Sequence, residues 1–276
     1  MALPPPEQPP ACRRENTRRF LASLLPALAV LALLAIGHWG WALVVFWATF
    51  VVIGYGSILP SSRLFGPHVS ELSSHQAQKN QVWITLDDGP DPQTTPALLD
   101  VLDRYQSKAG FFLIGDKARR YPELVQEIAK RGHLIGNHSQ THPAANFWIL
   151  RPNRMWAEVA GCQQTLTSIL GFAPVWFRPP VGHHNLFLSV PLRALGLTMA
   201  IWNCRGFDGV EKNPQRILKR IARSLKPGSI ILLHDGTSTC VEVLEGTLKL
   251  LSAHGLQAAL PERLHPPTPA PSLAES

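Results

Sequence analysis

The chain has 276 residues, with 26 Lys and Arg against 19 Asp and Glu, and a formal net charge of +7. Its basic residues form no dense run with interleaved aromatic residues, so the sequence does not favour a nucleic-acid partner. The four cysteines show no CxxC spacing, which argues against both a zinc knuckle and a disulfide framework.

The N-terminal part of the chain predicts a basic tail followed by a membrane anchor. Proline-rich residues and four arginines indicate a disordered basic tail over residues 1–19. Residues 20–59 contain no Asp, Glu, Lys or Arg, and as one helix they would measure about 60 Å, roughly twice the hydrocarbon thickness of a bilayer. A Gly-His-Trp-Gly break therefore predicts a hairpin of two transmembrane helices, residues 20–36 and 41–59. A single tilted span is the alternative, and the run is too long for the apolar part of a cleaved signal peptide.

The rest of the chain predicts a linker over residues 60–81, one domain over 82–264 and a disordered Pro-rich tail over 265–276. Within the domain, short apolar runs alternate with helical patterns. The predicted strands are residues 82–84, 110–114, 133–135, 175–177, 197–202 and 229–233. The predicted helices include residues 96–103, 121–130 and 153–170, the last capped by Asn153 and ended by Gly171, and three more lie before Gly196, after Asn213 and between 241 and 251. This alternation implies a parallel sheet, and about seven units suit a small or incomplete (β/α) barrel.

Two adjacent carboxylates, Asp87 and Asp88, directly follow the first apolar strand, and Gly-Pro-Asp-Pro stops that strand. Ligands bind at this C-terminal edge in open α/β sheets and in (β/α) barrels. Successive side chains near a strand end point in different directions, so we expect the two carboxylates to serve different partners, one a metal and the other a proton. The alternative is a solvated Asp-Asp-Gly turn.

His138 and His142 are four residues apart and also follow a short strand. On a helical turn this spacing places both imidazoles on one face, which suits a divalent ion of intermediate softness. With Asp88 they make two histidines and one carboxylate, the three-ligand pattern of catalytic zinc sites. The alternative is a pair of packed histidines.

Two further strand ends carry polar residues. His234 can act as a general acid, with a loop histidine as the alternative. Arg178 can pair with Asp87 and keep that carboxylate ionised and fixed, with a surface salt bridge as the alternative.

These four strand ends together resemble the polysaccharide deacetylase family, the NodB-homology domain of carbohydrate esterase family 4. TLDDGP resembles its first motif, HSQTH its second, FRPPVG its third and LLH its fifth, in order over nearly all of residues 82–264. The resemblance implies an α/β fold, an incomplete (β/α)7 barrel, that removes the N-acetyl group of an amino sugar through a metal-bound water. The donor set favours Zn²⁺, with Co²⁺ as the alternative.

The resemblance also assigns roles by position. Asp87 is the base, Arg178 orients it, and His234 is the acid. The metal ligands are Asp88, His138 and His142. The substrate-binding positions are Pro179, Val181 and Leu232. The backbone N–H of Val181, together with the metal, is implied to stabilise the oxyanion.

One motif departs from the family pattern. The family's fourth motif usually has an Asp, two residues and then Asp-Trp, but here Arg205 stands in place of the first Asp and Gly209 in place of the Trp. That Asp commonly supports the acid histidine in this family, so Asp208 can take over its role beside His234. The missing Trp, and Val181 in place of a usual aromatic residue, remove surface for sugar stacking and point away from a long chitin-type chain.

The sequence therefore predicts a membrane-anchored, metal-dependent carbohydrate N-deacetylase, which is an amide hydrolase. Four arginines before the first span place the N-terminus in the cytoplasm, and a hairpin returns the chain to the same face of the inner membrane. The expected substrate is then an N-acylated amino sugar carried on a lipid. With a single span, the domain would face the periplasm and act on peptidoglycan or exopolysaccharide. A catalytically inactive sugar-binding module is the remaining alternative.

Overall fold

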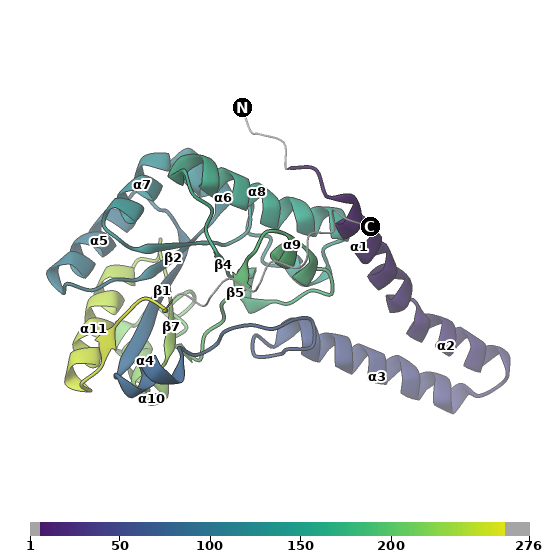
Figure 1. Cartoon of the computed structure of the whole chain (residues 1–276). Coiled ribbons are helices and arrows are strands. Elements are labelled where there is room, and N and C mark those ends of the chain that lie inside the picture. Colours follow the sequence, from purple (N-terminus) through teal and green to yellow (C-terminus); the bar gives the residue numbers. More distant parts are fainter. Residues whose placement is uncertain (1–5, 263–276) are drawn as a thin grey trace.

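A curled sheet of parallel strands lies at the centre of the computed structural model, which describes residues 6–262 (Figure 1). Its strands are β1 (Gln81–Gly89), β2 (Gly110–Leu113), β3 (Leu134–Asn137), β4 (Trp176–Phe177), β5 (Thr198–Met199), β6 (Cys204–Arg205), β7 (Ile230–His234) and β8 (Gln257–Ala258). Seven of them follow the order β5-β4-β3-β2-β1-β7-β6, and β8 pairs with the start of β1. This arrangement confirms the predicted incomplete barrel of parallel strands.

Helices of the domain pack around the sheet, and all but α4, which precedes β1, lie between strands in the chain (Figure 1). They are α4 (Ser74–Gln78), α5 (Thr95–Arg104), α6 (Gly115–Arg120), α7 (Pro122–Lys130), α8 (Pro152–Leu170), α9 (Ser189–Ala194), α10 (Pro214–Ser224) and α11 (Cys240–Ala253). Along β1, Ile84 and Leu86 belong to the main core together with helix residues such as Leu98. The side chain of Trp83 points to the other face and packs against Phe112. Both faces of β1 are thus buried, as its uninterrupted apolar run predicts.

The ends of α8 test the capping predictions. Gly171 ends the helix with a φ of +76°, a conformation that glycine adopts without strain, and this confirms the prediction. Asn153 is not the N-cap, because Pro152 takes the first helical position, where its missing N–H costs nothing, and Arg151 becomes the cap. The strand predicted over residues 197–202 is shorter in the structure, where only the two residues of β5 are paired. Strand β6 was not predicted, because its two residues are too few to form a recognisable pattern.

A helical hairpin projects from the domain (Figure 1). One arm consists of α1 (Pro10–Ser23) and α2 (Leu25–Ala35), the other of α3 (Trp39–Ile58), and the chain turns at Gly37 with a φ of +81°. Both arms are long and apolar enough to cross a membrane. Large side chains such as Leu31, Trp41 and Phe50 are exposed along them. An exposed apolar surface of this kind suits a lipid environment.

The prediction of a disordered tail over residues 1–19 is wrong for residues 10–19, which belong to α1; residues 1–5 lie outside the described part of the chain. Contacts with the domain hold this segment. Arg19 donates to the carbonyl oxygen of Leu186 at 2.7 Å and to Ser189 at 2.9 Å. Glu15 bonds both Arg19 and Arg193 of α9. Such tertiary contacts stabilise a helix that its own sequence would not specify.

Residues 60–81 are not a free linker, which corrects that prediction. Leu72 and Gln76 are buried, and Val69 and Glu71 form single bridges to Ala200 and Ser229. The Gln76 amide donates to the carbonyl oxygen of Leu260 at 2.9 Å. Some polar groups of this segment therefore hydrogen-bond the domain, while others, such as Gln78 and Lys79, are exposed. The predicted disordered tail, residues 265–276, lies outside the described residues.

Candidate active site

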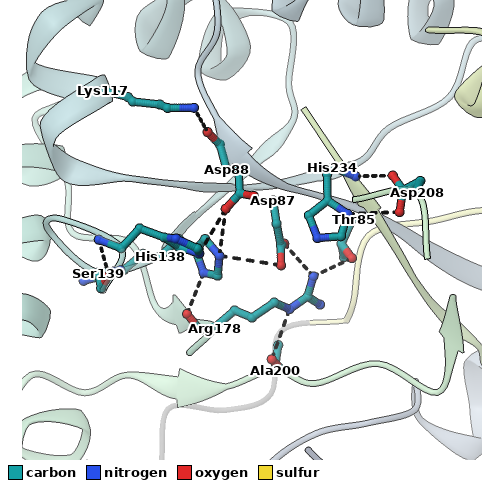
Figure 2. Close-up of polar contacts among 12 residues, drawn as sticks. Thr85, Asp87, Asp88, Lys117, His138, Ser139, Arg178, Ala200, Asp208 and His234 are labelled. Atoms are coloured by element: carbon teal, nitrogen blue, oxygen red, sulfur yellow. Dashed lines mark hydrogen bonds and ion pairs between the residues drawn. The ribbon is translucent and has the colours of Figure 1, made fainter. Parts of the chain in front are cut away.

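The two carboxylates at the end of β1 reach the same place because the strand is irregular there. Asp87 pairs with Phe112 of β2 and Gly89 with Leu113, so Asp88 is an extra residue in the ladder. Its φ of +71° is the left-handed conformation, which re-aims its side chain. Lys117 of α6 donates to the backbone oxygen of Asp88 at 2.7 Å (Figure 2). The irregularity thus brings adjacent side chains, which a regular strand would separate, into one site.

Arg178 holds Asp87 on the inner face of the sheet (Figure 2). Its Nη1 lies 2.8 Å from Asp87 Oδ1 and 2.7 Å from the hydroxyl of Thr85, and its Nε donates to the carbonyl oxygen of Ala200 at 3.2 Å. The guanidinium lies 4.1 Å from the centre of the Phe112 ring. Arg178 is fully buried and Asp87 nearly so. The structure thus brings together the pair that the sequence predicts, as a buried contact and not a surface salt bridge.

The HSQTH segment that follows β3 is a loop, so the helical turn that we expected is wrong. Ser139 and His142 both have positive φ values, of 64° and 54°. Asn137 accepts a hydrogen bond from the backbone of Ser139, and buried Glu158 of α8 accepts two from Thr141, at 2.7 and 2.8 Å. These contacts give the loop the shape that turns both imidazoles towards Asp88.

Three ligand-type atoms converge beyond β1 and β3. Asp88 Oδ1 lies 3.4 Å from His138 Nε2 and 3.2 Å from His142 Nε2, and one such atom from each residue lies within 4.8 Å of the others. The Nδ1–H of His138 donates to the carbonyl oxygen of Arg178 at 2.7 Å, which leaves Nε2 free to face Asp88. His138 Nε2 also lies 3.8 Å from Asp87 Oδ2. Both carboxylates thus lie near His138, whereas only Asp87 bonds Arg178.

The electrostatics of this cluster favour one positive charge among the three side chains. Burial lowers the pKa of His138, but the charges of Asp87 and Asp88 outweigh it and raise the pKa above its usual value. Burial and the charge of His138 lower the pKa of His142 to about 4. Burial raises the pKa of Asp88, but both histidines outweigh it and hold the pKa below its usual range. A divalent cation satisfies the same demand for positive charge, so the donor set fits a metal ion such as zinc.

His234, at the end of β7, lies beside Asp208 (Figure 2). Asp208 accepts hydrogen bonds from the backbone N–H of His234 at 2.7 Å and from its Nδ1 at 3.0 Å. Burial lowers the pKa of His234, but Asp208 and the charges of Asp87 and Asp88 outweigh it and raise the pKa to about 9. The two positions at which this chain departs from the family's fourth motif, Arg205 and Gly209, take no part in this pairing. The Arg205 guanidinium lies over the Phe207 ring, 3.9 Å from its centre, and a Cβ at Gly209 would lie 3.4 Å from the His234 ring.

Of the three positions assigned to substrate binding, only Val181 has an exposed side chain. Pro179 is buried, and Leu232 is buried on β7, where it pairs with Thr85. Val181 has a φ of 51°, which is strained for a β-branched residue. Such strain at a strand end is a mark of functional positions.

Sequence reasoning missed the residues that shape the site from behind: Lys117, Asn137 and Glu158. Glu158 carried a usable signal, because its spacing from Met155 and Cys162 places a carboxylate on the buried face of α8. A buried carboxylate needs hydrogen-bond donors. No sequence signal points to Lys117, because its acceptor is the backbone oxygen of Asp88, which is available only through the irregularity in β1.

Comparison with known proteins agrees with this geometry. A family model for polysaccharide deacetylase matches residues 74–200. The peptidoglycan-N-acetylmuramic acid deacetylase PdaC of Bacillus subtilis is 31% identical over 174 residues, 63% of this chain and 36% of that protein. A peptidoglycan-N-acetylglucosamine deacetylase of Bacillus cereus is 31% identical over 179 residues, 61% of this chain and 78% of that protein.

Among solved structures, a family 4 carbohydrate esterase from Streptomyces lividans in complex with acetate is 30% identical, with a TM-score of 0.61. The match covers 66% of this chain and 92% of the esterase chain. The predicted enzyme class, a carbohydrate deacetylase that hydrolyses an amide bond, is thus confirmed. The chain belongs to the polysaccharide deacetylase family.

Proposed function

We propose that this protein is a membrane-anchored, metal-dependent N-deacetylase that hydrolyses the N-acyl group of an amino sugar. The observation that carries the proposal is the convergence of Asp88, His138 and His142 beside the Asp87–Arg178 pair. The altered fourth motif does not favour an inactive sugar-binding module. Arg205, which replaces the usual Asp, cannot accept a hydrogen bond from His234, but Asp208 accepts one in its place.

Asp88, His138 and His142 would hold the metal, most readily Zn²⁺ with Co²⁺ as the alternative. When bound, the ion would supply a Lewis acid for the amide carbonyl and acidify water. The hydrogen bond from His138 Nδ1–H to the Arg178 carbonyl oxygen fixes the tautomer that such a ligand needs.

Asp87 is the proposed base. Arg178 bonds its Oδ1, and its Oδ2 lies 3.8 Å from His138 Nε2, so Oδ2 faces the ligand cluster. There it accepts a proton from the water whose oxygen forms a bond to the acyl carbon. Arg178 acts as a positioning residue, because its Nη1 fixes the direction of the carboxylate.

His234 is the proposed acid. In the metal-free protein its raised pKa favours the protonated imidazole, and its Nδ1–H is bound to Asp208. Nε2–H is then free to give its proton to the sugar nitrogen as the carbon–nitrogen bond breaks, which releases a free amine and a carboxylate. The strained backbone at Val181 supports its N–H as an oxyanion donor, and the buried Pro179 and Leu232 would shape the substrate pocket from behind.

The pairing of His234 with Asp208 predicts a pKa change that can be measured without substrate. In the metal-free protein, NMR titration should give His234 a pKa of about 9. Asp208→Asn removes the negative charge, so the pKa should fall towards the ordinary histidine value of about 6.5. Asp100→Asn, a surface change, should leave it unaltered. A pKa that stays high in Asp208→Asn would contradict the pairing.

The two adjacent carboxylates should separate by function. Asp88→Ala should lose both bound metal and activity, as should His138→Ala and His142→Ala. Asp87→Asn should retain the metal and lose turnover, because it removes only the proton acceptor. His234→Ala should also retain the metal while the rate falls by about 10²–10⁴-fold. Metal analysis and amine release from N-acetylated sugars would measure both properties, with Asp100→Asn as a matched control. Near wild-type turnover in Asp87→Asn would show that the carboxylate roles are assigned wrongly.

Metal removal should abolish the reaction. Protein stripped with a chelator should be inactive, and Zn²⁺ or Co²⁺ should restore activity better than Mg²⁺, which prefers oxygen ligands. Activity that survives complete removal, as judged by metal analysis of the same sample, would rule out this mechanism.

The anchor is proposed to be a transmembrane hairpin that leaves the catalytic domain on the cytoplasmic face of the inner membrane. Contacts at both ends of the hairpin support this. Arg19 near one end bonds the domain loop at Leu186, and at the other end the His184 backbone N–H donates to the carbonyl oxygen of Ser57 at 2.8 Å. A hairpin whose two ends contact one domain enters and leaves the bilayer on the same side. The four arginines of residues 13–19 favour the cytoplasm for that side.

This topology bears on the substrate. The two relatives described above are named for peptidoglycan, which a cytoplasmic domain cannot reach as finished wall. We therefore propose an N-acylated amino sugar carried on a lipid, such as a polyprenyl-phosphate-linked sugar, at the inner leaflet. The absence of an aromatic side chain at Gly209 and at the exposed, aliphatic Val181 also fits a short substrate better than a stacked polysaccharide.

Reporter fusions would test the topology. Alkaline phosphatase fused after Ser276 should be inactive, and a reporter that fluoresces only in the cytoplasm should be bright there. Active phosphatase at that position would overturn the cytoplasmic placement and make peptidoglycan or exopolysaccharide the expected substrate.

A further inference from the structure

A cavity of about 550 Å³ lies between the hairpin and the domain. One wall comes from the hairpin arms and includes Ala22, Ala48 and Val52. The opposite wall comes from two loops of the domain and includes Trp148, Ile149 and Phe187. Ile149 has 58% of its surface exposed. The cavity thus joins the two candidate membrane spans to the domain.

The two loops of the domain wall are those that carry the candidate active site. The loop after β3 contains His142 and reaches Trp148 six residues later. The loop after β4 contains Val181 and reaches Asn185 four residues later. A fully extended chain covers at most about 3.6 Å per residue, so the cavity wall lies within about 22 Å of His142 and about 14 Å of Val181. A ligand anchored in the cavity can therefore place a polar end at the site.

The lining restricts what can occupy the cavity. Among the described residues that line it, none is acidic and only Arg19 is basic. The Arg19 guanidinium is already bound to Glu15, Ser189 and the Leu186 carbonyl oxygen. The amide N–H groups of Asn185 are bound to carbonyl oxygens of the preceding loop. The charged and amide groups of the lining are thus engaged within the protein, and apart from the hydroxyls of Ser23, Thr49 and Ser57 the remaining lining side chains are apolar, which favours an apolar occupant.

We infer that this cavity holds the hydrocarbon chain of a lipid-linked amino-sugar substrate, with the sugar at the neighbouring site. The inference rests on the proposed deacetylase function and names the part of the molecule that recognises the lipid. An ordinary membrane lipid has the same hydrocarbon chemistry. If such a lipid filled the cavity, however, the enzyme would not prefer a substrate with a long chain over one without. A hydrocarbon chain held in the cavity would make contacts that a methyl group cannot make, so the longer ester should be the better substrate.

The test compares two substrates with one head group, the farnesyl and methyl esters of N-acetylglucosamine 1-phosphate. Both would be supplied in the same mixed micelles to the full-length, metal-loaded protein, and release of free amine would be measured. In the wild type, kcat/KM should be at least tenfold higher for the farnesyl ester. Ala48→Trp and Ala22→Trp fill the cavity from separate arms, and each should lower the farnesyl-to-methyl ratio about tenfold. Ala27→Trp, an exposed position outside the cavity, should leave the ratio unchanged.

The outcomes separate the inference from the function beneath it. No amine release from either ester in the wild type overturns the proposed function and the inference with it. Amine release with a ratio near one, or with a ratio that neither cavity variant changes, overturns the inference alone. Equal loss on both esters also overturns it, because the cavity would then serve the structure or hold a membrane lipid.

Discussion

The candidate site depends on a buried charge at its centre. Arg178 lies inside the curled sheet with no exposed surface, and Asp87 is the carboxylate that neutralises it at 2.8 Å. Burial of a single unpaired charge is strongly unfavourable, so each residue requires the other. The pair sets the direction of Asp87, and the carbonyl oxygen of Arg178 orients His138. One interaction therefore connects the proposed base with the proposed metal ligands.

Much of the architecture could be predicted from local patterns. The apolar run of β1 predicts a strand buried on both faces, and strand–helix alternation predicts the parallel sheet. The four motifs lie at strand ends, which parallel strands bring to one edge, so the grouping of Asp87, His138, Arg178 and His234 follows from the chain order. What could not be predicted depends on tertiary contacts. The left-handed conformation of Asp88 and the loop shape of HSQTH are held by Lys117 and Glu158, which lie in other elements.

The membrane-proximal segments show the same division between local and tertiary information. Composition identifies the two apolar arms and their break, because charge and glycine are local signals. Composition does not reveal how residues 10–19 and 60–81 are held, because that depends on contacts with the domain through groups such as Arg19 and Gln76. As a result the hairpin is joined to the domain at both ends, next to the loops that carry the site. In the proposed function, this arrangement connects membrane attachment to the choice of substrate.

The central claim is that the site directs water to an N-acyl carbon. Its most direct test is the reaction of the full-length, Zn²⁺-loaded protein with an N-acetylated amino sugar in water enriched in oxygen-18, followed by mass spectrometry of both products. The account predicts one free amine per acetate and one heavy oxygen in each acetate. Acetate without the label, or no acetate from lipid-linked, oligosaccharide or peptidoglycan substrates, would contradict it.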